Sequence, residues 1–414
     1  MEFYRQSWIN INLDALYHNL QEIKFLFPTG IYVIAVVKAD AYGHGILPIA
    51  RYLESKAVNY LAVASLDEAI FLRENGIRSP ILVMGPVSTR DIQIAQFYNV
   101  TLTVTDEGFA KELRRYVVNH LDSSLKVHIK IDTGMRRLGL SLAHAEDVII
   151  SLFTSGLALE GIYTHFASAD SDPDFTLTQI NRFSGLLRRL RAKGIDFDLV
   201  HISNSAGLVY RRVFEGMSNA VRPGLALYGA YASTDLRDLM RLEPVLSLHS
   251  RISVIRELRP GEGLGYNHTY ISDRWRRVAV LPIGYGDGYP RVLSNRGCVL
   301  IRERRCPIVG KICMDQLFVD VSELDEVRVG DEVVLIGRQG QEEIRVEEIA
   351  SWCNTIAYEL LCQLGRRLPR KYSSRRFRVS REDVENNAVR RKEVGDKVKR
   401  YVLNRDRGQV KDLI

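Results

Sequence analysis

The stretch Ile31-Tyr-Val-Ile-Ala-Val-Val37 decides the fold, because it is an apolar, β-branched run that is followed at once by a charged residue, Lys38. Seven more runs of this kind follow, and amphipathic segments with helical periodicity lie between them. The runs are Tyr60–Ala64, Ile81–Met84, Val100–Val104, Val127–Ile131, Leu159–Thr164, Leu199–Ile202 and Ala220–Val221. Strand and helix alternating in this way predict an α/β fold, a parallel (β/α)8 TIM barrel.

The main alternative is a doubly wound parallel sheet, which has the same alternation of strands and helices. Such a sheet normally carries a Gly-x-Gly-x-x-Gly turn after an early strand, and this chain has none there. The pattern therefore favours the barrel.

After about Leu242 the pattern changes to short strands separated by Gly and Pro turns, which predicts a mainly antiparallel β-domain. The strands expected there are Leu246–Val254, Arg277–Leu281, Cys298–Ile301, Cys306–Val309, Leu317–Val321 and Glu332–Ile336. One amphipathic helix, Val346–Cys362, is expected to follow. The predicted domains are a barrel over 8–242, a β-domain over 243–372 and a basic C-terminal extension over 373–414.

The positive charge is concentrated in that extension. The 414 residues include 57 Lys and Arg against 50 Asp and Glu, a net charge of +7. Residues 373–414 hold 13 of the basic and 7 of the acidic residues, so the rest of the chain carries only +1. A nucleic-acid-binding domain shows a basic face on its folded body, so nucleic acid is an unlikely partner.

Cysteine usage and the N-terminal sequence predict a cytoplasmic protein. The five cysteines are odd in number and form no Cys-x-x-Cys pair, which favours reduced thiols over disulfides or a zinc site. The chain has no signal-peptide pattern at its start and no apolar stretch of about 20 residues that could cross a membrane.

Polar residues follow the carboxyl ends of several predicted strands, where the reactive residues of a (β/α)8 barrel lie. We expect them to meet at one mouth of the barrel. They are Lys38, Asp132 to Arg137, His165, Asn204, Ser205 and Arg222.

Lys38 is the most informative of these residues, because seven apolar residues precede it. Burial would lower its pKa and free its amine for Schiff-base chemistry, although a strand-end lysine can also simply reach solvent. Asn204 and Ser205 at a helix start offer a hydroxyl and N–H groups to a phosphate, or act as a plain N-cap. Together with Arg222 these features favour pyridoxal 5′-phosphate as cofactor.

Longer motifs resemble those of the alanine racemases, which are barrel enzymes that use pyridoxal 5′-phosphate. The clearest is Ala35-Val-Val-Lys-Ala-Asp-Ala-Tyr-Gly-His-Gly45, and the resemblance extends from about residue 8 to about 372. The other motifs are Lys130-Ile-Asp-Thr-Gly-Met-Arg-Arg-Leu-Gly139, Thr164-His-Phe-Ala167, His201-Ile-Ser-Asn-Ser-Ala206, Val221-Arg-Pro-Gly224, Gly265-Tyr266, Leu281-Pro-Ile-Gly-Tyr-Gly-Asp-Gly-Tyr-Pro-Arg291, Gly310-Lys-Ile-Cys-Met-Asp-Gln316 and Asn354-Thr-Ile-Ala-Tyr358.

The resemblance implies a two-base mechanism in a homodimer. Lys38 would bind the cofactor covalently and serve as one acid/base group, and Tyr266 from the partner subunit would serve on the opposite face of the substrate. Arg222 would lie at the pyridine nitrogen, where it favours racemisation over transamination because it keeps its proton.

The remaining roles also follow from the resemblance. Tyr42, Asn204, Ser205, Gly224, Leu225 and Tyr358 match cofactor contacts, mostly at the phosphate, and His165 matches the residue beside the pyridine ring. Arg137 and Met314 match groups that receive the substrate carboxylate, and Tyr285 and Asp315 match the access path. Lys130 aligns with a lysine that many members carry as a carbamate. Arg136 departs from the family pattern, which leaves open which arginine faces the substrate.

The implied function is an isomerase that interconverts L- and D-alanine and supplies D-alanine for cell-wall peptidoglycan. A racemase of the same fold for serine or a basic amino acid is an alternative, and so is a non-catalytic protein that binds the cofactor. A fold-related decarboxylase fits less well, because those enzymes place an acidic residue where this chain has Arg222.

Overall fold

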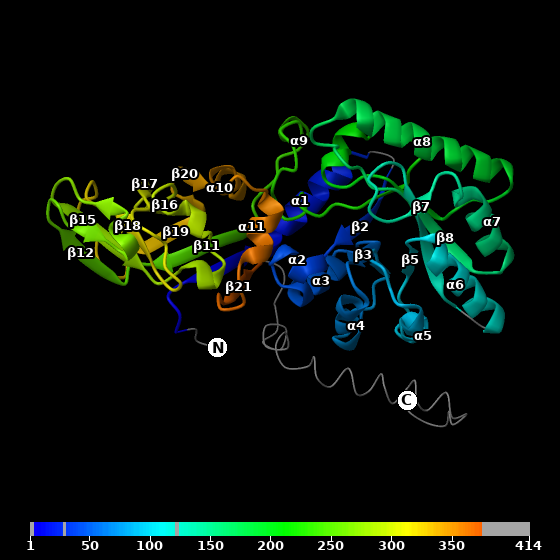
Figure 1. Ribbon diagram of the computed structural model, residues 1–414, viewed down its shortest axis with the longest axis horizontal. Coiled ribbons are helices and arrows are strands. Elements are labelled where there is room, and N and C mark those ends of the chain that lie inside the picture. Colours follow the sequence, from blue (N-terminus) through cyan, green and yellow to red (C-terminus); the bar gives the residue numbers. More distant parts are fainter. Residues whose placement is uncertain (1–3, 28–29, 121–123, 375–414) are drawn as a thin grey trace, which may run out of the picture.

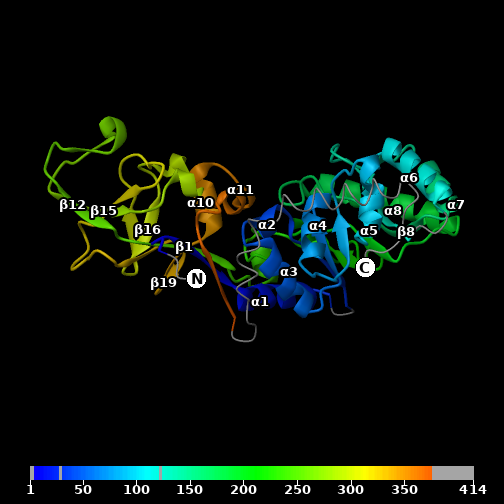
Figure 2. The same ribbon diagram turned by 90° about the horizontal axis from the view of Figure 1, so that it is seen from below.

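The computed structural model describes residues 4–27, 30–120 and 124–374 of the chain (Figure 1). The predicted basic extension, 373–414, lies outside the described residues from residue 375 on. Figures 1 and 2 show two domains side by side, with the barrel on the right and the β-domain on the left.

The first domain is a ring of eight parallel strands. They are β2 (Tyr32–Val36), β3 (Tyr60–Val63), β4 (Ile81–Val83), β5 (Leu102–Val104), β6 (Lys126–Asp132), β8 (Ala158–Tyr163), β9 (Leu199–His201) and β10 (Ala220–Val221). The ring closes because β10 pairs with β2, and because a parallel bridge between Leu82 and Thr101 joins β4 to β5. The predicted (β/α)8 barrel is confirmed. A doubly wound sheet is excluded, since it would have two open edges.

Helices surround the barrel and begin shortly after the strands. The longer ones are α1 (Leu13–Phe25), α3 (Ile46–Ser55), α4 (Leu66–Glu74), α5 (Ile92–Phe97), α6 (Glu107–Asn119), α7 (Ala145–Thr154) and α8 (Pro173–Ala192). Asp106 caps α6 by accepting a hydrogen bond from the N–H of Phe109, and Asp172 caps α8 in the same way, with Pro173 in the first turn. Within the described parts of the chain, no helix is both long and apolar enough to span a bilayer.

The second domain is mainly antiparallel, as predicted. Its large sheet has the order β17-β16-β19-β11-β1-β21, with β20 on β19, and beside it lie the sheet β12-β15-β18 and the ribbon β13-β14. The strands are β1 (Trp8–Asn12), β11 (Leu246–Arg251), β12 (Val254–Leu258), β13 (Gly263–Leu264), β14 (Tyr270–Ile271), β15 (Arg276–Leu281), β16 (Cys298–Ile301), β17 (Arg304–Pro307), β18 (Leu317–Asp320), β19 (Glu332–Gln339), β20 (Glu342–Ile344) and β21 (Arg370–Ser373).

The first strand of the chain belongs to this second sheet. Trp8 of β1 pairs with His249 of β11 in antiparallel register, and Ile9 pairs with Arg370 of β21 in parallel register. Asn12 then caps α1, which leads into the barrel. The segment 8–242 therefore contributes one strand to the sheet of the other domain.

The expected single helix Val346–Cys362 is two helices, so this prediction was wrong. Asn354 ends α10 (Val346–Cys353) in the left-handed conformation, with φ 53°, and α11 (Ala357–Gln363) starts in a new direction. The break brings α11 against the barrel beside α2 (Lys38–Tyr42).

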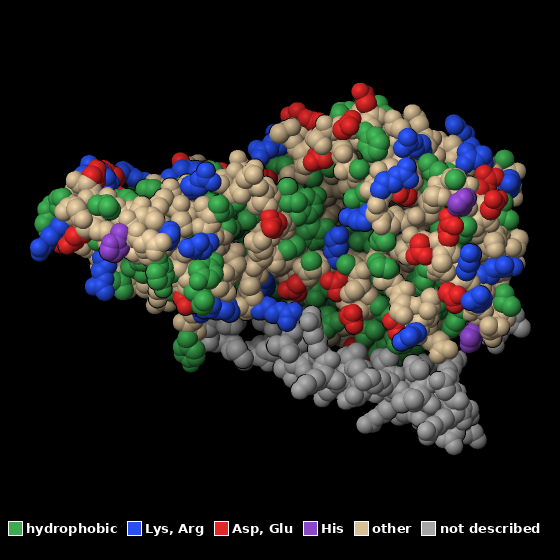
Figure 3. Space-filling model, viewed as in Figure 1, with side chains coloured by type: hydrophobic (Ala, Val, Ile, Leu, Met, Phe, Trp, Pro, Cys, Tyr) green, Lys and Arg blue, Asp and Glu red, His purple; other side chains and the backbone are tan. Residues whose placement is uncertain are grey.

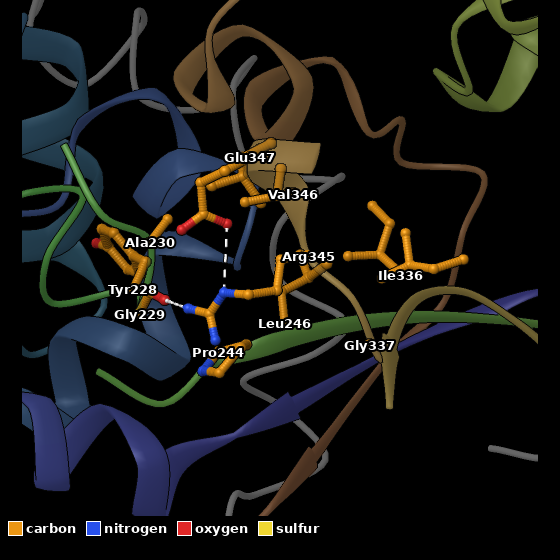
Figure 4. A pocket seen from close by; sticks show the side chains of 12 residues that line it. Tyr228, Gly229, Ala230, Pro244, Leu246, Ile336, Gly337, Arg345, Val346 and Glu347 are labelled. Carbon is orange, nitrogen blue, oxygen red and sulfur yellow. Dashed lines mark hydrogen bonds and ion pairs between the residues drawn. The ribbon is translucent and has the colours of Figure 1, made fainter. Parts of the chain in front are cut away.

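A small cavity lies at the junction between the domains, and Arg345 lies across it (Figure 4). Its Nη2 donates a hydrogen bond to the Gly229 carbonyl (2.8 Å), and its Nε lies 3.6 Å from the Glu347 carboxylate. Glu347 in turn accepts a hydrogen bond from the N–H of Tyr231 (2.9 Å). These contacts fasten α10 to the barrel, so the position of α11 is fixed as well.

Candidate active site

Lys38 stands at the start of an unusual turn at the barrel mouth. The four residues after it, 39–42, all have φ near +53°, although none is glycine. This conformation costs about 1–2 kcal/mol per residue, so other contacts must hold it. The Glu68 carboxylate does so by accepting hydrogen bonds from the N–H groups of Ala39 (2.7 Å) and Ala64 (2.8 Å). Backbone strain that is maintained by surrounding contacts is a feature of functional sites.

Burial lowers the pKa of Lys38, as the sequence predicts, and the nearby charge of Arg137 lowers it further. A lower pKa makes more of the neutral amine available, and the neutral amine is the nucleophilic form. Lys38 is therefore suited to covalent chemistry with a carbonyl group.

A cluster of four cations, Lys38, Lys130, Arg137 and Arg222, lies at the mouth. Lys130 on β6 and Arg222 after β10 lie on the ring of Tyr163, at 5.6 and 4.8 Å from its centroid. Burial lowers the pKa of Lys130 to about 8, and the charges of Arg137, Arg222 and Lys38 add to this effect. Such a cluster is suited to anionic ligands, which would balance its charge. Figure 3 shows Lys and Arg side chains, together with hydrophobic ones, in the hollow between the two domains.

The structure distinguishes the two adjacent arginines that the sequence left open. Arg136 lies 3.9 Å from the Asp132 carboxylate, to which its N–H also donates a hydrogen bond. The charge of Arg137 instead acts on Lys38, Lys130 and His165. Arg137 is therefore the arginine that belongs to the cation cluster.

Arg222 is almost completely buried and is held in one orientation. Its Nη1 donates to Nδ1 and to the carbonyl of His201 (2.7 and 2.8 Å), and its Nη2 donates to the Thr164 carbonyl (2.6 Å). His165 lies beside it, with Nδ1 at 3.4 Å from Nη2. Among the described residues no acceptor lies on the Nε–H of Arg222, so this donor is left for a ligand.

A group of donors suited to a phosphate lies next to Arg222. Ser205 Oγ accepts hydrogen bonds from the N–H groups of Gly224 (3.0 Å) and Ala226 (3.1 Å), which leaves its own O–H to donate. Tyr42 covers Gly224 so closely that a Cβ there would lie 2.4 Å from its hydroxyl. Within the described ranges, the hydroxyls of Tyr42 and Ser205 and the N–H of Leu225 donate to no protein acceptor.

Tyr358 and Asn204 complete this part of the site in different ways. The Tyr358 ring, on α11, lies 5.9 Å from that of Tyr42. The Asn204 side chain accepts a hydrogen bond from the N–H of Gly207 (2.9 Å), so it caps the short helical turn that carries Ser205. Asn204 therefore positions Ser205, whereas Tyr358 extends the donor group.

The other predicted site residues lie on the β-domain. Tyr266 follows β13 and is 66% exposed, and Tyr285 and Met314 are also exposed. Asp315 pairs with Arg367 (2.6 Å). Both views place β12 and β15, which flank the segment containing Tyr266, at the end of the β-domain away from the barrel (Figures 1 and 2). In the described part of the chain, no hydrogen bond or ion pair joins these four residues to the barrel group.

Several residues near the site were not predicted from the sequence. His201 holds Arg222, and His201 in turn contacts His128 (2.8 Å). His128 and Lys130 alternate along β6, so a period-two pattern of polar residues in an otherwise apolar strand was the signal that could have found His128.

The fold and site together define a barrel enzyme with a reactive lysine, a phosphate-binding donor group and a cation cluster. The family model "Alanine racemase, N-terminal domain" matches residues 11–232, and "Alanine racemase, C-terminal domain" matches 245–372. The chain belongs to the alanine racemase family, whose enzymes are isomerases that depend on pyridoxal 5′-phosphate.

Individual relatives agree over nearly their whole length. An alanine racemase of Halothermothrix orenii is 42% identical over 373 residues, which are 90% of this chain and 98% of that protein. One from Carboxydothermus hydrogenoformans is 41% identical, over 89% of this chain and all of that protein. The crystal structure of alanine racemase from Bacillus anthracis with bound L-Ala-P has a TM-score of 0.83 and 38% identity, and covers 92% of this chain and 98% of that one.

Proposed function

We propose that this chain interconverts L- and D-alanine with pyridoxal 5′-phosphate as its cofactor, and supplies D-alanine for peptidoglycan. The observation that carries the proposal is the barrel mouth, where the desolvated Lys38 amine stands among cations and beside unpaired phosphate donors. Relatives of about 40% identity that are named alanine racemases support alanine as the substrate.

The residues at the mouth fit the cofactor. Lys38 would hold its aldehyde carbon, and Tyr42, Ser205 and Tyr358 with the N–H groups near Gly224 and Leu225 would hold its phosphate. The Nε–H of Arg222 would face the pyridine nitrogen, and His165 would lie beside the ring. Burial lowers the pKa of Arg222 only to about 10, so the guanidinium remains protonated at neutral pH.

When bound, the cofactor withdraws electrons from the substrate α-carbon and so makes its hydrogen acidic. The chain then has to remove a proton from one face and supply one to the other. The Lys38 amine serves one face, and the phenol of Tyr266 from a partner subunit serves the other. Arg222 donates a hydrogen bond but does not release its proton, which favours reprotonation of the carbon over transamination.

Recognition of alanine is assigned to groups on both domains. Arg137 and Met314 would receive the substrate carboxylate, and Tyr285 and Asp315 would border the access path. A tyrosine beside a methyl-sized pocket excludes serine less well than it excludes long basic side chains, because selectivity by bulk is weak between small groups.

We expect the two halves of the site to come together from two copies of the chain. Tyr266, Tyr285 and Met314 are exposed on the β-domain, and β12 and β15, which flank the segment containing Tyr266, lie at the end of that domain away from the barrel (Figure 1). A homodimer with twofold symmetry would place the β-domain of each subunit over the barrel mouth of its partner. The proposed location is the cytoplasm, where the five free cysteines would stay reduced.

The test is to incubate the purified protein with cofactor and L-alanine, and to follow D-alanine with a chiral assay. L-serine, L-lysine and L-arginine serve as parallel substrates. We expect D-alanine to form faster than any other D-amino acid. Bound cofactor without D-alanine would contradict the proposal and favour a non-catalytic protein.

Mixing two inactive variants tests the shared site. In a mixed dimer of Lys38→Ala and Tyr266→Phe, one site carries both substitutions and the other carries neither. Random exchange of subunits should therefore restore about one quarter of the wild-type activity. No recovery, in mixtures shown by mass spectrometry to contain mixed dimers, would refute a site shared between subunits.

The carbamate proposed on Lys130 has its own test. A pKa near 8 leaves much of this amine neutral at mildly alkaline pH, and only the neutral amine reacts with carbon dioxide. Protein supplied with ¹³C-bicarbonate at pH 8 should show a carbamate carbon signal that is absent from Lys130→Ala.

A further inference from the structure

A line of four polar side chains crosses the interior of the barrel from the mouth to the opposite end. It starts at Arg222 after β10, continues through His201 on β9 and His128 on β6, and ends at Glu160 near the start of β8. Both histidines are fully buried, and the Glu160 side chain is 13% exposed. The reaction described above uses only Arg222.

The distances determine which atom donates at each step. An arginine can only donate, so Nδ1 of His201, at 2.7 Å from Arg222 Nη1, must accept. His201 then carries its proton on Nε2 and donates it to Nδ1 of His128 (2.8 Å). By the same reasoning His128 carries its proton on Nε2 and donates to Glu160 Oε2 (3.2 Å). Each of the two histidines thus has one tautomer. Each hydrogen bond of the line is donated in the direction from Arg222 to Glu160.

The charges fit this assignment. Burial lowers the pKa of both histidines, which keeps them neutral. Burial works against the charge of Glu160, but hydrogen bonds from His128, Lys126 and Tyr60 outweigh it and lower its pKa to about 2. Lys126 Nζ lies 2.7 Å from Oε1, and the Tyr60 hydroxyl lies 2.5 Å from Oε2. Glu160 is therefore an ionised, fixed acceptor.

The barrel is shaped around this line. A Cβ at Gly161 would lie 2.8 Å from the His128 ring, so only glycine leaves room for the imidazole between the strands. The Tyr163 ring stacks on His201 at 4.6 Å. Packing on both sides restricts the two rings to the orientations that the hydrogen bonds require.

We propose that His128 and Glu160 are positioning residues for Arg222. By fixing the tautomer of His201 they keep its Nδ1 an acceptor, and they thereby hold the guanidinium with its Nε–H towards the cofactor position. The positioning role adds to the proposed function. It rests on that function for the role of Arg222 at the cofactor. In the intact line Arg222 and Glu160 favour the same tautomer of His201 from opposite ends. Without Glu160 only the N–H of Arg222 opposes a proton on Nδ1 of His201, so the second tautomer becomes accessible.

The variant Glu160→Leu removes the final acceptor, and His128→Leu breaks the line one step nearer to Arg222 while leaving Lys126 and Tyr60 on Glu160. Glu332→Gln is the matched control, because Glu332 makes the same kind of contact with a histidine, His249 Nδ1 at 2.8 Å, in the β-domain. Glu160→Gln keeps an oxygen acceptor and should restore much of what Glu160→Leu loses.

The first readout is ¹⁵N NMR of the histidine rings in the full chain without cofactor. In the wild type we expect His201 and His128 to be neutral with the proton on Nε2. Glu160→Leu should give mixed tautomers at both rings, and His128→Leu should do so at His201. Retention of the single wild-type tautomer at His201 in both variants overturns the proposal.

The second readout separates kcat from KM with the cofactor bound. Both leucine variants should lower kcat about tenfold, the effect of one hydrogen bond of ordinary net strength, with KM for alanine within twofold. A kcat within twofold of that of Glu332→Gln also overturns the proposal. A wild type that does not racemise alanine contradicts the proposed function, whereas the tautomers of the cofactor-free chain test the positioning line by themselves.

Discussion

In the barrel half of the site the proposed cofactor groups are buried or half-buried, whereas the β-domain half is exposed. Ser205 and Arg222 retain 2% and 3% of their surface, while Tyr266 and Met314 retain 66% and 53%. The groups proposed to hold the cofactor are thus fixed by their own chain. The groups that the β-domain is proposed to offer to the substrate stand on a surface that another subunit would cover.

Exposure of the β-domain residues does not mean that their backbone is loosely held. The fully buried Asp287 carboxylate pairs with Arg5 (2.5 Å) and Arg367 (3.5 Å), and Arg367 also pairs with Asp315. The N–H of Gly286 donates to the Met314 carbonyl (2.9 Å), which joins the two loops. The exposed side chains are therefore presented on a rigid base.

The largest effect should come from the barrel half. Lys38→Ala removes one of the two proposed acid/base groups and should lower kcat by about 10²–10⁴-fold or more. Tyr266→Phe should lower it by a similar factor, although the residue lies on the exposed half. Both are measured by the chiral alanine assay. An equally large loss of thermal stability would mean that the activity was lost through unfolding.

Low pH should lower the free energy of unfolding through His44, which is buried in the barrel domain. Burial lowers the pKa of this histidine from 6.5 to about 4, so the unfolded chain binds a proton more readily than the folded chain. Its contribution is complete above pH 6.5 and is lost as the pH falls towards 4, about 3 kcal/mol in all. Urea unfolding at pH 7.5, 6.0 and 5.0 should show a shallower pH dependence for His44→Phe than for the wild type. Identical slopes would refute this.

Asp287→Ala tests the rigid base of the exposed half. It removes the acceptor for two arginines and for the N–H of Gly284, which should cost about 1–3 kcal/mol of unfolding free energy. Since Tyr285 and Asp315 would shift with their loops, KM for alanine should rise. An unchanged KM in a folded variant would show that these loops do not contribute to substrate binding.

The smallest effect should come from Met314, in the same half of the site. Met314→Ala changes a largely exposed side chain and should alter the unfolding free energy by less than about 0.5 kcal/mol. Equilibrium unfolding checks this, with Asp287→Ala as the contrasting variant. A cost above 1 kcal/mol in the isolated subunit would contradict the exposed position.

Local patterns were sufficient to predict much of the barrel. The eight apolar runs became strands within a few residues of their expected limits, because each run is short, buried and bounded by helical segments. Lys38, Ser205 and Arg222 could be placed at the mouth because parallel strands present their carboxyl ends together.

Other features depend on partners that are distant in the sequence. Strand β1 is recognised only by its pairing with β11 and β21, and the left-handed turn over 39–42 is held by Glu68 from the next unit. The break at Asn354 separates α10 from α11, and α11 then contacts α2, which is distant in the sequence. The contact between His128 and His201 joins two strands, and the alternation of polar residues in β6 does not identify the partner of His128.

The place of β1 has a consequence for the order of synthesis. This strand leaves the ribosome before every strand of the barrel, yet its neighbours are residues 246–251 and 370–373. The last barrel strand, by contrast, ends at residue 221. The barrel can therefore close while β1 still has two open edges, which are prone to unwanted pairing with other chains. The second domain is completed only when both ends of the described chain meet, so its assembly should be the slow step of folding.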